Sequence, residues 1–261
     1  MSKTLPNIVI SNSELQAIRE RAHHYMTGAE GIIIRQPNKC VVRKILLSEI
    51  RDEEYRTKKD LEAIRENKLQ KVIRLGTTEG LLNELSISAT LTSEDKTFIG
   101  YEMTSTDVLY PLDTNPLLKD EKLDYLKALR RRLENFHEHG IIYGDIKDSN
   151  ILVNREKGII CFCDLDNVQI GTHTIDLMNY SIQRFADENG HIQEGADHYM
   201  FNVLTLNQLY YPFMDYRELI DKLGSVQVSE TAPKEVGKIL RKMQKKSTYF
   251  DGGYLIDYLK K

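Results

Sequence analysis

The chain lacks any apolar run long enough to cross a bilayer, and its polar start, Met1–Thr4, lacks a signal-peptide core. It also lacks a strong excess of either charge, with a formal net charge of −3. This balance gives no general attraction to nucleic acid or anionic membranes. Cysteines are few, and the three present cannot all pair with one another, which favours a reducing compartment. We therefore expect a soluble, cytoplasmic protein with no membrane span and no nucleic-acid partner.

The stretch 143–150, Y-G-D-I-K-D-S-N, and the C-D-L-D at 163–166 are the most informative parts of the sequence. They place a carboxylate, a lysine, an amide and a second carboxylate at spacings that suit phosphoryl transfer from a magnesium nucleotide. In that reaction a protein mainly positions a hydroxyl, holds metal ions and neutralises phosphate charge. A surface loop beside an ordinary hairpin is the alternative for either motif taken alone.

Each of these tasks has a candidate residue. Asp145 would accept a hydrogen bond from the attacking hydroxyl, and Lys147 could reach the phosphate being transferred. Asn150 and Asp164 offer the hard oxygen ligands that magnesium prefers. Short apolar strands on either side of the turn 154–157 predict a hairpin, which would bring Asp164 back beside Asn150.

The order of these residues resembles the catalytic loop of the protein kinase-like superfamily, H-R-D-L-K-x-x-N, followed by the metal-binding D-F-G. The resemblance implies an α+β, two-lobed fold, and 261 residues suffice for one such domain. We expect a small β-rich lobe over residues 1–103 and a mainly helical large lobe over 104–261. The resemblance also implies ATP and Mg²⁺ as cofactors, and a protein serine or threonine as phosphate acceptor.

Two phosphate-binding motifs of the family have counterparts in the small lobe. The segment from Met26 to Ile33 aligns with G-x-G-x-x-G-x-V, with Gly28 and Gly31 as the second and third glycines and Met26 replacing the first. Glycine lets backbone amides approach phosphates closely. The strand 40–47 resembles V-A-I-K, which implies that Lys44 contacts the α- and β-phosphates. A plain hairpin turn and a solvated strand lysine are the alternatives.

The family pairs that lysine with a glutamate of the next helix, and the charged stretch 52–69 is predicted to be this helix. Glu62 lies among its apolar positions, and a glutamate facing inward there needs a partner. Glu62 is therefore the candidate, with Glu54 and Glu84 as rivals.

Strands expected at 85–92 and 97–103 complete the small lobe. The stretch 101–104, Y-E-M-T, resembles the hinge whose backbone binds adenine, so Glu102 and Met103 are the expected adenine contacts.

In the large lobe, leucines at three-to-four spacing predict a helix over 120–139 that ends at Gly140. The resemblance implies that Asp197 supports the catalytic-loop backbone. Further amphipathic segments lie around 215–223 and 233–243.

Three residues depart from the family pattern. Tyr143 and Gly144 replace His-Arg, and Asp166 replaces the glycine of D-F-G. A glycine before the aspartate is common in small-molecule phosphotransferases of the aminoglycoside and choline kinase type, which usually lack a lysine at the position of Lys147. That lysine favours a serine/threonine protein kinase. A small-molecule phosphotransferase and a nucleotide-binding pseudokinase scaffold remain the alternatives, and the sequence does not indicate an oligomeric state.

Overall fold

The computed structural model describes most of the chain. The described residues are 4–20, 26–27, 31–35, 40–46, 58–78, 81–82, 85–114, 116–165, 168–171, 191–223, 234–244 and 253–259. The chain divides into two compact units, Met1–Val108 and Leu109–Lys261. The division falls after the last strand of the first unit, a few residues beyond the 103/104 boundary expected from the sequence.

The first unit is built on a mixed six-stranded sheet with the order β1-β5-β6-β4-β3-β2. Its strands are β1 (Asn7–Ile10), β2 (Met26–Thr27), β3 (Gly31–Arg35), β4 (Val41–Leu46), β5 (Leu85–Ser93) and β6 (Phe98–Ser105). The edge strand β1 pairs with β5 in parallel, and every other neighbouring pair is antiparallel. The strand expected at 40–47 is present as β4, and the strands expected at 85–92 and 97–103 are present as β5 and β6.

Two helices pack against this sheet. The helix α1 (Asn12–Glu20) begins where the Ser11 hydroxyl accepts the Glu14 backbone N–H at 3.1 Å, a typical N-cap. Its buried Leu15 and Ile18 join a core cluster with strand residues Ile10, Ile32, Ile45, Leu91 and Ile99. The long helix α2 (Lys58–Thr77) packs against β5 and β6. It approaches β5 closely at Gly76, where a Cβ atom would lie 3.2 Å from that of Ile87.

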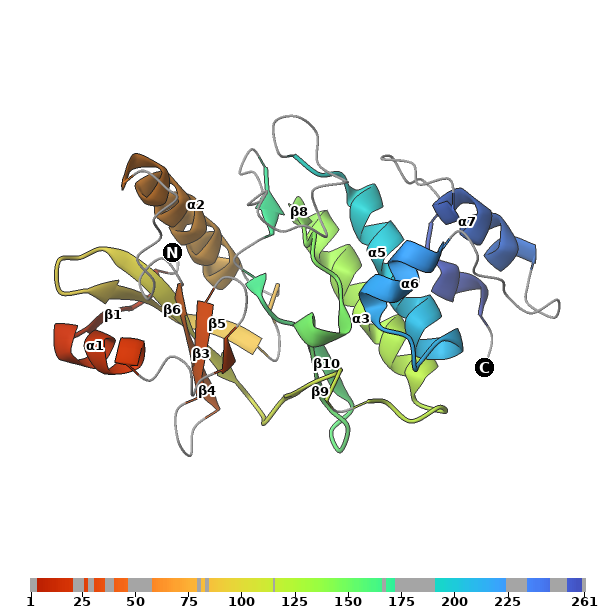
Figure 1. Cartoon of the computed structure of the whole chain (residues 1–261), viewed down its shortest axis with the longest axis horizontal. Helices are drawn as coiled ribbons and strands as arrows, with labels where there is room; N and C mark the ends of the chain where they lie inside the picture. Colours follow the sequence, from red (N-terminus) through yellow and green to blue (C-terminus); the bar gives the residue numbers. More distant parts are fainter. Residues whose placement is uncertain are drawn as a thin grey trace. The chain divides into compact units, whose positions relative to one another are not determined.

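The second unit is mainly helical (Figure 1). Its helices are α3 (Lys122–Glu138), α5 (Glu194–Tyr210), α6 (Tyr216–Lys222), α7 (Lys234–Gln244) and a 3-10 turn at Leu255–Tyr258. The helix α5 packs against α3 and is buried over most of its length, as expected for a helix that is apolar on nearly all sides. The helix predicted over 120–139 is confirmed as α3, and the amphipathic segments noted around 215–223 and 233–243 contain α6 and α7.

Short strands form two small sheets in this unit. They are β7 (Tyr110–Pro111), β8 (Ile141–Ile142), β9 (Ile151–Asn154), β10 (Ile159–Phe162) and β11 (Gln169–Ile170). The hairpin of β9 and β10 is antiparallel, with Ile151 opposite Phe162.

The architecture is therefore α+β and compatible with a two-lobed kinase-like fold. Within the described ranges, every helix falls short of the length and hydropathy that a membrane crossing requires.

Candidate functional site

The segment that carries the candidate catalytic residues begins where α3 ends. Gly140 follows that helix with a φ of 70°, a left-handed conformation that glycine adopts at little cost and that turns the chain into β8. A 3-10 turn, Asp148–Asn150, then leads into the β9–β10 hairpin. At the far end of the hairpin, the Cys163 N–H donates to the Asn150 carbonyl at 2.9 Å. The prediction that the hairpin returns the chain to Asn150 is confirmed.

Asp145 is the centre of this loop and is only 4% exposed. Its Oδ2 atom accepts hydrogen bonds from Lys147 Nζ and from Asn150 Nδ2, each at 2.8 Å. Asn150 Nδ2 also donates to the Asp145 backbone carbonyl at 3.0 Å. The structure thus brings together three of the four candidate residues, and two donors fix the orientation of the Asp145 carboxylate.

The backbone before Asp145 is held by a buried aspartate of α5. The Asp197 carboxylate accepts the N–H groups of Tyr143 at 2.8 Å and Gly144 at 2.7 Å. Its Oδ2 atom also lies 2.8 Å from Nε2 of His137, in the last turn of α3. Asp197 itself has no exposed surface. Its predicted role as support for the catalytic-loop backbone is confirmed, whereas the contribution of His137 was not predicted.

Charge and burial shift the pKa of His137 in opposite directions. Burial lowers it, but the hydrogen bond to Asp197 and the charges of Asp197, Glu194 and Glu134 together outweigh burial, so the net shift is upward. The link between α3, α5 and the catalytic loop is therefore a charge-assisted hydrogen bond.

Tyr143 connects the loop to the residue before Asp164. The Tyr143 hydroxyl donates to the Cys163 carbonyl, and its ring packs 4.6 Å from that of Phe162 between centroids. Burial, followed by the charges of Cys163, Asp164, Asp145 and Asp197, raises the pKa of Tyr143 well above its ordinary value, so the hydroxyl stays protonated and can donate. Sequence reasoning noted Tyr143 only as a departure from histidine and missed this contact.

Asp164 has a φ of 60°, in the left-handed region. Aspartate and asparagine enter this region more readily than most residues because their short polar side chains can bond to nearby backbone. Asp164 lies two residues past the end of β10. Asp166, which replaces the glycine of D-F-G, lies outside the described residues.

In the first unit, Lys44 lies on β4 with 4% of its surface exposed. It pairs across the sheet with Ile33 of β3 on one side and Tyr101 of β6 on the other. Gly31 is pressed against this strand: a Cβ there would lie 2.6 Å from the Ile45 carbonyl oxygen and 3.3 Å from Cε of Lys44. Close packing on β4 thus gives Gly31 a structural reason to be glycine. Gly28 lies outside the described residues.

The expectation that Glu62 faces inward is wrong. Its side chain is exposed on α2, whereas the buried residues within 61–77, where the structure describes side chains of this helix, are Lys68, Lys71, Val72 and Leu75. The apolar residues near Glu62 were too few to reveal which side packs on the sheet, because that side includes two lysines. An exposed Glu62 is not placed to pair with the buried Lys44.

The residues expected to form the hinge lie within a strand instead. Glu102 and Met103 lie inside β6, a strand with β5 on one side and β4 on the other. The Glu102 side chain forms an ion pair with Arg43 of β4 at 3.1 Å. The Glu102 backbone carbonyl accepts a hydrogen bond from the Ser88 hydroxyl. A strand paired on both sides uses its backbone groups in the sheet, so the backbone of these two residues is not available to adenine in the way expected of a hinge. The strand runs two residues past Met103.

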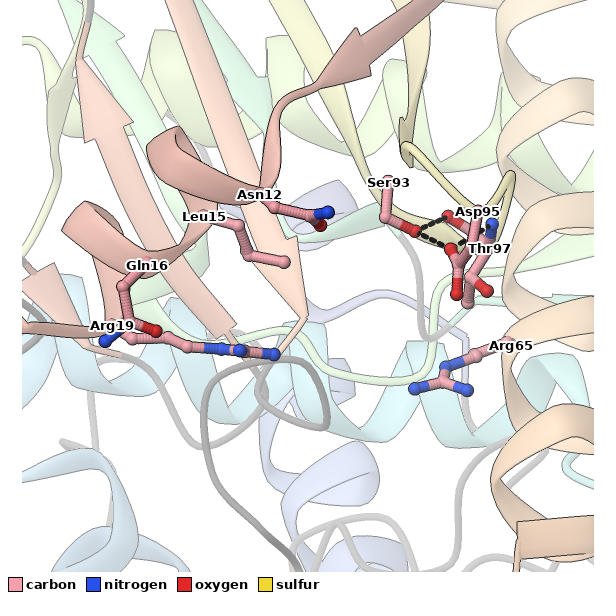
Figure 2. Close-up of a pocket in the computed structure, with 8 residues that line it drawn as sticks. All are labelled: Asn12, Leu15, Gln16, Arg19, Arg65, Ser93, Asp95 and Thr97. Carbon is pink, nitrogen blue, oxygen red and sulfur yellow. Dashed lines mark hydrogen bonds between the residues drawn. The ribbon is translucent and has the colours of Figure 1, made fainter.

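The first unit also contains a hollow formed by α1, α2 and the turn between β5 and β6 (Figure 2). Arg19 and Arg65 lie at its lower edge in that view, and the Ser93 hydroxyl donates to Asp95 on the opposite side. Sequence reasoning did not single out these residues, and basic and acidic side chains share the lining. The remaining lining residues are Asn12, Leu15, Gln16 and Thr97.

Comparison with known proteins gives one distant similarity. No family model matches the chain. Mitogen-activated protein kinase 4 of Oryza sativa subsp. japonica is 26% identical over 151 residues, which cover 55% of this chain and 37% of that kinase. The chain thus spans little more than a third of the length of the relative. This similarity indicates a kinase-like relationship.

Proposed function

We propose that the chain is a phosphotransferase that uses Mg-ATP and transfers phosphate to a hydroxyl group, most specifically a serine/threonine protein kinase. The observation that carries the proposal is the arrangement around Asp145. A buried carboxylate is held by a lysine and an amide on a loop whose backbone is anchored by Asp197. The kinase-like relationship supports the same reaction class.

The proposed reaction assigns a separate task to each residue. Asp145 orients the acceptor hydroxyl and takes its proton, because two donors fix the orientation of its carboxylate. Lys147, already 2.8 Å from Asp145, supplies positive charge for the transferred phosphate as negative charge develops on its oxygens. Lys44 of the first unit is the proposed contact for the α- and β-phosphates.

The donor set of the second unit fits Mg²⁺. Asn150 uses Nδ2 for both of its bonds to Asp145, so its other amide atom, Oδ1, is the one that a cation would contact. Asp164 adds a carboxylate just after the hairpin that returns to Asn150. Oxygen donors of this kind suit magnesium. When bound, Mg²⁺ would neutralise phosphate charge, and Asn150 and Asp164 would keep it in register with Asp145.

Lys147 is the reason to prefer a protein acceptor. Gly144, which has a φ of 79° and no side chain to offer, is the feature shared with small-molecule phosphotransferases. The ion pair between Lys147 and Asp145 gives the lysine a defined place in the loop, as the protein-kinase assignment requires.

A transfer assay with labelled ATP distinguishes these acceptor classes. The wild-type protein is incubated with Mg²⁺ and either a serine- and threonine-rich protein or small alcohols of the aminoglycoside and choline type. We expect label on the protein, and its loss when EDTA removes the metal. Label on small alcohols alone would replace the protein-kinase assignment, and label on neither acceptor, with ATP still bound, would favour a pseudokinase.

A further inference from the structure

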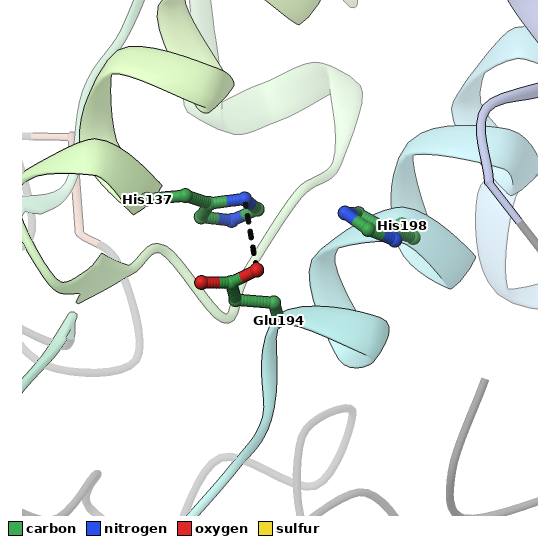
Figure 3. A group of neighbouring side chains, drawn as sticks. All are labelled: His137, Glu194 and His198. Atoms are coloured by element: carbon green, nitrogen blue, oxygen red, sulfur yellow. Dashed lines mark ion pairs between the residues drawn. The ribbon is translucent and has the colours of Figure 1, made fainter. Parts of the chain in front are cut away.

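Two histidines and a glutamate of the second unit lie together outside the candidate catalytic loop (Figure 3). His137 belongs to the last turn of α3, Glu194 is the first residue of α5, and His198 lies one turn further along α5. Residues four apart on a helix share a face, so Glu194 and His198 both lie beside the end of α3. One possible ligand atom from each residue lies within 4.8 Å of the others.

The hydrogen bonds of His137 determine which of its nitrogens can bind a cation. Nε2 lies 2.8 Å from the Asp197 carboxylate, which is an acceptor, so Nε2 carries the hydrogen. In the neutral ring, Nδ1 then holds a lone pair, and it faces the Glu194 carboxylate at 4.0 Å. That distance is too long for a hydrogen bond. Two electron-pair donors that face each other in this way are stabilised by a cation between them.

The separation is close to that of two ligands on one metal ion. Bonds of about 2.0–2.1 Å in tetrahedral geometry place neighbouring ligand atoms about 3.3 Å apart. Small side-chain rotations would close the gap, and Glu194 is free to rotate because 57% of its side chain is exposed. His137, whose side chain is only 9% exposed, is fixed by Asp197. A histidine oriented by a carboxylate on its other nitrogen is the usual arrangement at metal centres.

The surroundings also favour a cation. The negative charges of three carboxylates, those of Asp197, Glu194 and Glu134, contribute to the electrostatic potential at His137. Arg130 contributes a positive charge near His198.

We propose that His137, Glu194 and His198 form a binding site for a divalent transition-metal ion, for which Zn²⁺ is the probe. Two imidazoles and one carboxylate suit zinc, whereas Asn150 and Asp164 offer only the oxygens that suit magnesium. Asp197 connects this site to the backbone of Tyr143 and Gly144, so the bound ion stabilises the anchor of the candidate catalytic loop. The site does not depend on the proposed phosphotransferase function.

Calorimetric titration of the full chain with Zn²⁺, after metal removal, tests the site. We expect one equivalent to bind and its affinity to fall more than about 100-fold in His198→Gln, which removes a direct ligand, since loss of an outer partner alone costs about 10–100-fold. Glu194→Gln should also lower the affinity for Zn²⁺. Because the Glu194 side chain is largely exposed, this substitution should leave the fold intact, so a loss of affinity cannot be attributed to misfolding. His139→Gln is the matched control, because His139 follows the same helix and bonds to the Asn135 carbonyl instead.

Co²⁺ in place of Zn²⁺ identifies the ligands by absorption. The site predicts a cobalt spectrum without thiolate charge-transfer bands, lost in His198→Gln and retained in His139→Gln. Thiolate bands, equal affinity in all four proteins, or no one-equivalent binding by the wild type would each overturn the proposal. In the last case, a proton rather than a metal ion would lie between His137 and Glu194.

Discussion

The two units differ in how well their functional residues are connected. In the second unit, Asp145, Lys147 and Asn150 are joined by direct hydrogen bonds, and Asp197 holds the backbone that precedes them. In the first unit, Lys44 lies on the expected strand and is buried, but Glu62 is exposed and the expected adenine contacts belong to a strand. The proposed chemistry is therefore best supported by the second unit.

The largest expected effect tests whether Asp197 organises the second unit. Asp197→Asn places an amide donor where one carboxylate oxygen accepts hydrogen bonds, and it removes the charge that faces His137. We expect a loss of about 3 kcal/mol or more in the free energy of unfolding of this unit. Hydrogen exchange read by mass spectrometry would report it as faster exchange at Tyr143 and Gly144.

Glu102→Gln is the matched variant in the first unit. Its ion pair with Arg43 is partly exposed, so about 1 kcal/mol or less is expected. Equal losses of protection in the two variants, or unchanged exchange around Tyr143 in Asp197→Asn, would remove the difference in anchoring between the units.

The second prediction concerns Asp164, a proposed magnesium ligand. Asp164→Asn keeps a side chain that tolerates the φ of 60°, which alanine would strain, but it removes the charge that a metal would contact. A ligand whose free concentration is about 100 times its dissociation constant stabilises the folded protein by about 2.7 kcal/mol. We expect the Mg-dependent rise in melting temperature with ATP in the wild type and a much smaller rise in Asp164→Asn. Rises of the same size would exclude Asp164 from the metal site.

Contacts between residues close together in the sequence were easier to predict than contacts between distant residues. Asp145, Asn150 and Asp164 lie within twenty residues, and one hairpin returns the chain to Asn150, so spacing alone was informative. Asp197 is more than fifty residues from Tyr143, yet the family resemblance identified it. Glu62 could not be placed because the packed side of α2 includes Lys68 and Lys71, which a hydrophobic pattern assigns to solvent.

Side-chain contacts formed by folding had no sequence signal of their own. His137 donates to Asp197, and the Tyr143 hydroxyl donates to the Cys163 carbonyl. No spacing or motif in the sequence predicts either contact. The sequence predicted too early an end for β6, because strand and hinge residues have similar sequence patterns. The register of β6 with β4 and β5 shows that Glu102 and Met103 are paired within the sheet.

A third prediction tests the contact beneath Asp164. Tyr143→Phe removes the hydroxyl that donates to the Cys163 carbonyl but keeps the ring packing on Phe162. We expect a loss of about 1 kcal/mol in unfolding free energy. Denaturant midpoints for Tyr143→Phe and for Tyr125→Phe, whose hydroxyl donates to the Arg155 carbonyl at 3.3 Å, provide the comparison. An unchanged midpoint for Tyr143→Phe would show that the Tyr143 hydroxyl is dispensable.

The smallest effect is a pH dependence at Asp148. Burial raises the pKa of this carboxyl, with smaller contributions from the charges of Asp113 and Asp215. A raised carboxyl pKa means that the ionised form destabilises the fold, a cost that disappears as the pH falls through the folded-state pKa. Asp148→Asn should therefore be more stable than the wild type at pH 7, by less than about 1 kcal/mol after solvent screening.

This stability difference should shrink as the medium is acidified toward the ordinary aspartate pKa of about 3.9. Denaturation curves measured at several pH values would show it. A difference that is constant with pH, or a less stable variant at pH 7, would rule out the titration of Asp148 as the cause.

The central claim is that Asp145 acts on the acceptor hydroxyl and not on the nucleotide. The most direct test is phosphate transfer from labelled Mg-ATP, measured together with ATP affinity, for the wild type, Asp145→Asn and the matched control Asp148→Asn. We expect Asp145→Asn to lose about 10²- to 10⁴-fold in turnover with its ATP affinity retained, while Asp148→Asn keeps most of its turnover. Unchanged turnover in Asp145→Asn, or an equal loss in both variants, would contradict the account.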